Sequence, residues 1–283
     1  MEAHMESFAV NNNNYPTNVY AANDPTDVFC SKTWVGKLNS RVVFGSPAEM
    51  LLPFYEIVTP LSETIGMELK IDASHDVINK NDDDTRNISY GRVKIEALIG
   101  NGQHVIGQNA AENISETVGL IYAFDLGHPE IIVYHGTRVM SCLNLMVFGA
   151  TDVRRFRYLQ EGTEKAYEYI NDYASSFGRK TEEHAAIIKK LMDTNWDKDD
   201  VNTNVGKMLI HTTLNNSYGS AAVNALVADL VNPKSKYALN NNGSTTAWNV
   251  LQALTQHVTD KSYLNVAPVK TLQMSEHIME LVN

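Results

Sequence analysis

Residues 131–148 read IIVYHGTRVMSCLNLMVF, two apolar runs separated by Gly136 and Thr137. Apolar runs on either side of a glycine are typical of two buried strands joined by a turn. Directly after them, residues 151–158 read TDVRRFRY, in which arginines interleave with aromatic residues. No other stretch is so apolar and so cationic at once, so we expect the chain to be organised around it.

Upstream of this stretch the sequence predicts more strands joined by turns. The segment from Arg92 to Ile99 alternates apolar and charged residues, as a half-buried strand does. The glycine-rich segment 100–107 has its third glycine displaced from the dinucleotide-binding pattern, so it predicts a hairpin turn instead. Other strands are expected at residues 54–59, 67–72, 116–125 and 130–148.

Beyond Tyr158 the apolar residues recur at helical spacing. A helix is expected from Thr163 to Phe177, with Tyr167 on its apolar face and Gly178 ending it. Further helices are expected at residues 181–192, 205–214, 221–231, from Thr245 to about 258, and 272–282. The apolar face expected for the helix that begins at Thr245 consists of Trp248, Leu251, Leu254 and Val258.

Strands followed by helices predict an α+β fold, with an antiparallel curved sheet in the first half and a helical second half. We expect three parts: a flexible, asparagine-rich N-terminal arm at residues 1–27, a β-rich part at 28–158 and a helical part at 159–283. The helical part is expected to pack on the sheet as one composite domain.

The composition is that of a globular chain, with 283 residues, 43% hydrophobic residues and a net charge of −10. The sequence has no secretory signal and no apolar run near the roughly 18 residues of a membrane helix. We therefore expect a location in the cytoplasm of a host cell and no membrane partner. The net charge argues against bulk electrostatic coating of nucleic acid, although a local basic groove is compatible with it.

The catalytic motifs that a sequence can reveal are missing from this one. It has no HExxH or CxxC pattern for zinc and no GxSxG nucleophile turn, so we expect no cofactor and no metal and assign no catalytic residue. The acidic run Asp82–Asp84 lacks the glycine and distal glutamate of a calcium loop. His135 is the best single candidate for a functional turn, since a histidine in a sharp turn between strands can be exposed; a hydrogen-bonded structural role is the favoured interpretation.

Several short motifs resemble a family of phage and plasmid proteins whose function is unknown. They are Val58-Thr-Pro-Leu61, Tyr134-His-Gly-Thr-Arg138 followed by Cys142-Leu-Asn144, Thr246-Ala-Trp248 and Leu254-Thr255. Typical members have a His-Asp-Gly-Ser turn, whereas this chain keeps His135 and Gly136 and lacks the aspartate. The resemblance covers roughly residues 54–258 and implies a mobile-element origin beside replication or recombination genes. The general plan is also similar to single-strand annealing proteins of the Rad-fifty-two and phage recombinase type.

An arginine-rich strand exit of this kind is suited to a single nucleic-acid strand, because arginines contact phosphates while bases stack on aromatic rings. Alternatively, the arginines pair with nearby acids and the rings belong to the core. The candidate nucleic-acid-binding residues are Arg138, Arg154, Arg155, Phe156, Arg157 and Tyr158.

We therefore expect a non-enzymatic protein that binds single-stranded DNA or RNA as a homo-oligomer, in replication or recombination. The first alternative is a structural protein, or one that contacts a host protein such as a defence factor, which the net charge of −10 fits better. The second alternative is a metal-independent nuclease or nucleotide hydrolase that uses His135.

Overall fold

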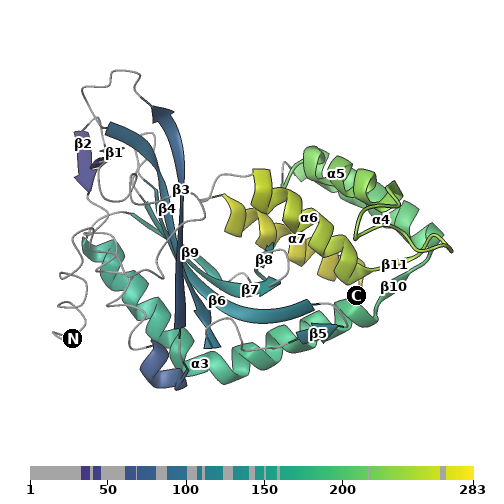
Figure 1. Ribbon diagram of the computed structural model, residues 1–283, viewed down its shortest axis with the longest axis horizontal. Coiled ribbons are helices and arrows are strands. Elements are labelled where there is room, and N and C mark those ends of the chain that lie inside the picture. Colours follow the sequence, from purple (N-terminus) through teal and green to yellow (C-terminus); the bar gives the residue numbers. More distant parts are fainter. Residues whose placement is uncertain are drawn as a thin grey trace. The chain divides into compact units, whose positions relative to one another are not determined.

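The sheet and helices are described from a computed structural model (Figure 1). The predicted N-terminal arm, the predicted strand at 54–59 and Tyr158 lie outside the described residues. The structure describes residues 33–38, 41–45, 61–67, 69–80, 88–100, 107–109, 112–123, 130–139, 144–149, 151–157, 160–215, 217–261 and 266–283.

In the first half of the chain, the described residues form a mostly antiparallel sheet of nine strands. Its central path has the order β2-β1-β4-β6-β7-β8, while β3 pairs with β4, β5 with β6 and β9 with β7. Strands β1 and β4 pair in parallel over a short register, which the sequence did not indicate. The strands are β1 (Thr33–Leu38), β2 (Arg41–Gly45), β3 (Leu69–Lys80), β4 (Ile88–Ile99), β5 (Gly107–Asn109), β6 (Glu112–Ala123), β7 (Glu130–Val139), β8 (Asn144–Met146) and β9 (Val153–Arg157).

Helices dominate the second half, which confirms the α+β class. A two-stranded ribbon of β10 (Asn195–Trp196) and β11 (Thr245–Thr246) interrupts them. The helices are α3 (Gln160–Asp193), α4 (Lys198–Asn215), α5 (Ser220–Val231), α6 (Ala247–Lys261) and α7 (Ala267–Leu281).

The predicted turn at Gly136 and Thr137 is wrong, because β7 continues through both residues. Thr137 pairs with Met146 of β8, and a Cβ atom at position 136 would collide with the carbonyl oxygen of Met146. The glycine therefore allows close approach of a neighbouring backbone rather than a change of chain direction.

The predicted helix break at Gly178 is also wrong, because α3 runs without interruption from Gln160 to Asp193. Gly178 is exposed, and it does not adopt the positive φ angle that is common for a glycine at a helix end. An interior glycine costs a helix about 1 kcal/mol relative to alanine, which the rest of a long helix can offset. Tyr167, predicted on the apolar face, is exposed instead.

The chain divides into two compact units, each made of three separate stretches of the sequence. Unit 1 comprises residues 1–104, 116–135 and 154–180, and unit 2 comprises residues 105–115, 136–153 and 181–283. The predicted boundary at 158 and 159 falls between β9 and α3, where strands give way to helices. The boundaries of the compact units instead pass through β6, β7, β9 and α3.

Unit 1 has an interior of buried strand residues that includes a hydrogen-bonded polar pair. The Tyr134 hydroxyl of β7 donates a hydrogen bond to the Glu96 carboxylate of β4, and both side chains are buried. Gly119 of β6 makes room for this pair, since a Cβ there would collide with the Tyr134 ring. Buried residues of α3 in this unit are Ala166, Ile170, Tyr173 and Ala174.

Unit 2 is built around Trp248, which is fully buried on α6. Strand β8 packs against α6 and α7, as Figure 1 shows. The side-chain amide of Asn144 on β8 donates to the Gln252 carbonyl oxygen at 3.0 Å and to the Tyr237 hydroxyl at 3.3 Å. The apolar face predicted for this helix, Trp248, Leu251, Leu254 and Val258, is buried as expected.

Candidate functional site

Strand β9 carries the exposed cations of the predicted nucleic-acid site. Arg154 and Arg155 are both exposed, and Phe156 between Arg155 and Arg157 is half-buried. Successive side chains of a strand point to opposite faces, so exposure of two neighbours means that both faces of β9 are open at this point. Among the described strands, β9 pairs with β7 alone, which makes β9 an edge strand. Arg157 ends β9, and its side chain lies outside the described residues.

Arg138 belongs to a different environment from the two exposed arginines. It is 5% exposed on β7, where it pairs with Leu145 of β8. The guanidinium of a residue buried between strands cannot reach a phosphate in solvent, so we remove Arg138 from the predicted surface. The error follows from the predicted turn, which would have placed Arg138 at the start of an open strand.

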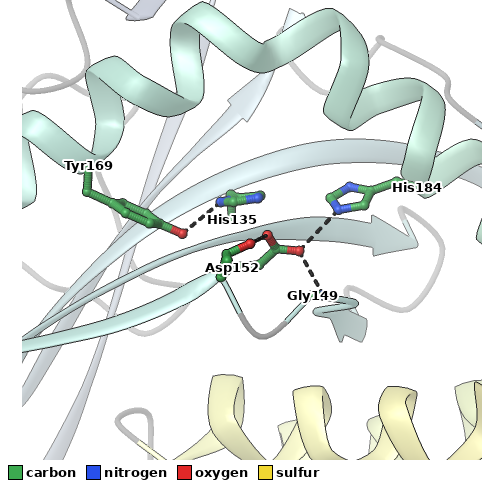
Figure 2. Close-up of polar contacts among 6 residues, drawn as sticks. His135, Gly149, Asp152, Tyr169 and His184 are labelled. Carbon is green, nitrogen blue, oxygen red and sulfur yellow. Dashed lines mark hydrogen bonds and ion pairs between the residues drawn. The ribbon is translucent and has the colours of Figure 1, made fainter.

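His135 is likewise inside β7 and not in an exposed turn. It is 2% exposed, its Nδ1 lies 2.9 Å from the Tyr169 hydroxyl, and its ring stacks on Tyr173 with centroids 4.2 Å apart. Figure 2 shows the contact with Tyr169 of α3. A substrate could reach this imidazole only if the helix moved away, so we do not assign catalysis to His135.

A buried aspartate and histidine of unit 2 form a pair that the sequence did not reveal. Asp152 and His184 are 1% and 2% exposed, and Oδ2 of Asp152 lies 3.3 Å from Nε2 of His184 (Figure 2). The same oxygen accepts the backbone N–H of Gly149 at 2.8 Å, in a tight turn that ends at Asp152. A Cβ at position 149 would lie 2.7 Å from this oxygen. The turn residues Gly149 and Asp152 were visible in the sequence, but the partner histidine is on another element.

Unit 2 also brings together His211 of α4 and His277 of α7. Their rings stack with centroids 3.9 Å apart and planes inclined by 24°. Nδ1 of His211 lies 3.0 Å from the Ser217 hydroxyl, and Nδ1 of His277 lies 3.3 Å from the Glu280 carboxylate. The buried Tyr218 ring flanks both imidazoles, and burial raises the pKa of its hydroxyl well above the usual range.

Unit 2 further exposes an apolar face on two neighbouring helices. Ile210 and Leu214 are 61% and 76% exposed on α4, and Val227 and Val231 are exposed on α5. Each pair is four residues apart, so its members lie on one side of their helix. A groove of about 300 Å³ runs over Leu209, Ile210, Thr213 and Leu214. We call the four exposed residues the α4–α5 apolar face.

Comparison with family models, curated proteins and solved structures gave no match to this chain. The resemblance to the phage and plasmid family therefore remains a prediction. Each helix of the described part of the chain falls short of the length or hydropathy needed to cross a membrane.

Proposed function

We propose that this protein binds single-stranded nucleic acid along the edge strand β9, in a replication or recombination role. The observation that carries the proposal is the pair of consecutive exposed arginines, Arg154 and Arg155, beside the half-buried ring of Phe156. No catalytic step is part of this proposal.

The chemistry of these side chains suits a phosphate backbone. Guanidinium groups donate bidentate hydrogen bonds to phosphate oxygens, and a base stacked on an aromatic ring contributes about 1–3 kcal/mol. Because the net charge of the chain is −10, binding has to depend on this local pair and not on a long-range positive field. Such binding is expected to weaken as salt concentration rises, since each phosphate contact releases counterions.

The test is a fluorescence-polarisation titration with single-stranded and duplex DNA and RNA at two salt concentrations. Charge-assisted hydrogen bonds contribute about 1.5–3 kcal/mol each, so Arg154→Ala with Arg155→Ala should weaken single-strand binding at least about tenfold. The plot of log affinity against log salt concentration should become less steep by about 1.4, which is about 0.7 for each of the two lost phosphate contacts.

The matched control is Lys189→Ala with Lys190→Ala, which removes the same charge from two exposed lysines of α3. That variant should bind like the wild type. Unchanged affinity in the arginine variant, or equal losses in both variants, would remove β9 from the binding surface. A preference for DNA or RNA would follow from the same titrations.

A second candidate function, assembly through protein contacts, is favoured by the α4–α5 apolar face. Exposed apolar residues that form a contiguous patch often mark interaction sites, whereas single exposed apolar residues are common on any protein surface. We infer that the occupant is a second copy of this chain, because the exposed apolar residues of α4 and α5 can pack against the same residues of that copy around a two-fold axis.

Size-exclusion chromatography with light scattering tests this assembly. The wild type should show a dimer or larger closed oligomer, and Ile210→Ser with Leu214→Ser should be monomeric at the same concentration. Lys207→Ser, an exposed change on the same helix, is the control and should leave the mass unchanged. A monomeric wild type would leave this face without a second copy and would direct attention to a host protein.

A further inference from the structure

Two imidazoles form a contact between α4 and α7. His277 is 7% exposed, and its ring lies face to face with that of the half-buried His211 at 3.9 Å between centroids. Neutral imidazoles carry no net charge, so they stack without charge repulsion. Two imidazolium rings in the same positions would repel, and partial burial weakens the screening by water.

The groups around the pair restrict how a second charge can be accommodated. The titratable groups that contact His277 are His211 of α4, Tyr218 of the turn after α4, and Glu280 of α7 itself. Glu280 is exposed, so water screens the compensation that its carboxylate offers. Strand β8 also packs on α7 and carries no titratable residue, whereas α6 carries His257, Asp260 and Lys261 toward its C-terminal end.

His277 has further reasons to stay neutral in the folded chain. Its Nε2 is buried and has no hydrogen-bond partner among the residues that the structure describes, and the same holds for the hydroxyl of Tyr218. Burial, and next the charge of His211, lower the pKa of His277 below its usual value, and the Glu280 contact offsets only part of this. The folded state therefore takes up a proton at His277 less readily than the unfolded state.

We propose that the His211–His277 stack is a proton-sensitive latch of unit 2. When both imidazoles are neutral, the stack holds α4 and the turn at Ser217 and Tyr218 against α7. When the pair takes up protons, the like charges separate the rings and release this end of α4. This inference does not depend on nucleic-acid binding or on self-association.

The direction of the pH dependence follows from linkage. The contribution of neutral His277 to folding stability is fully present above the pKa of an unfolded histidine, about 6.5, where His277 is neutral in both the folded and the unfolded chain. As the pH falls below that value the unfolded chain binds a proton that folded His277 resists, so stability decreases until the pH passes below the folded pKa. Each unit of difference between the two pKa values lowers the ratio of folded to unfolded chain about tenfold.

The first experiment is urea unfolding of the full chain at pH 7.5 and 5.5, followed by the fluorescence of buried Trp196 and Trp248. Between these pH values the contribution of His277 should lower the wild-type ratio of folded to unfolded chain by up to about tenfold. His277→Gln should lose most of this pH dependence, and adding His211→Gln should change it little further, because one partner is already uncharged. His257→Gln, on α6, is the matched control and should keep the wild-type response.

Hydrogen exchange and NMR test the latch where a variant is too unstable for unfolding experiments. After correction for the intrinsic exchange rate, residues 198–215 of the wild type should lose protection at pH 5.5 and regain it at pH 7.5. The His277 imidazole, identified by its missing signal in His277→Gln, should titrate below the usual midpoint and move upward in His211→Gln. The proposal would be overturned if the His277 midpoint had the usual histidine value and did not change in His211→Gln. An identical pH response in all variants would also overturn it.

Discussion

The two units place charged side chains in opposite surroundings. Unit 1 carries Arg154 and Arg155 on an edge strand in solvent, while unit 2 encloses Asp152 and His184 almost completely. Exposed charges contribute little to stability and can be reached by a ligand from solvent, whereas a buried pair becomes costly as soon as one partner is lost. Substitution of the exposed arginines of unit 1 should therefore affect binding, and substitution of the buried pair of unit 2 should affect folding.

The largest effect on folding is expected from Asp152→Ala. It leaves the buried His184 and the partly buried Gly149 N–H without the carboxylate that both contact, and removing one partner of a buried pair costs about 3–5 kcal/mol. Urea unfolding measures the loss. Asp152→Asn, which keeps an oxygen that can accept one of these hydrogen bonds, should lose less. Equal stability of Asp152→Ala and the wild type would contradict the difference stated here between the exposed arginines of unit 1 and the buried pair of unit 2.

A smaller loss is expected from Gly119→Ala inside unit 1. The added methyl group would collide with the Tyr134 ring and displace it from Glu96, and overpacking of this kind typically costs about 1–3 kcal/mol. The same unfolding experiment measures it, with Gly178→Ala as a control at an open helical position, where added helix propensity should stabilise slightly. If Gly119→Ala leaves the free energy of unfolding unchanged, the Tyr134–Glu96 pair is not a rigid part of unit 1.

The smallest effect is expected from Arg154→Ala with Arg155→Ala. Substitutions of exposed side chains usually change stability by less than about 0.5 kcal/mol, and a surface ion pair adds at most about 1 kcal/mol. The melting temperature should stay nearly constant in a calorimetric scan while single-strand affinity falls. A large drop in melting temperature would mean that these arginines support the fold, and the contrast between the units would no longer hold.

Hydrophobic periodicity was sufficient to predict the fold class. The alternation from Arg92 to Ile99 indicated β4, although Glu96 on its predicted polar face is buried as well. The helical spacing of Trp248, Leu251 and Leu254 indicated the buried face of α6, because burial on one side of a helix imposes its period on the sequence. Glycine was ambiguous: Gly136 serves a close approach between strands, and Gly178 is simply tolerated in a helix. A single sequence does not distinguish these roles from a turn or a helix end.

The candidate sites were predicted only in part, for a related reason. The arginines of β9 are neighbours in the chain, so a local pattern revealed them. Asp152 and His184 belong to a turn and a helix, and His211 and His277 belong to two different helices, so these contacts exist only after tertiary packing. Arg138 was misplaced because its exposure depended on a turn that β7 does not make.

The hydrogen bond from Asn144 to the Gln252 carbonyl has a consequence for biosynthesis. The two residues are separated by 108 positions, and β8 also depends on α6 and α7 for burial of its apolar side chains. At about 5–20 residues per second, a ribosome needs on the order of 5–20 s to supply that partner after β8 has been made. Throughout that interval an apolar strand lacks its native cover, which makes the nascent chain a substrate for chaperones and vulnerable to aggregation.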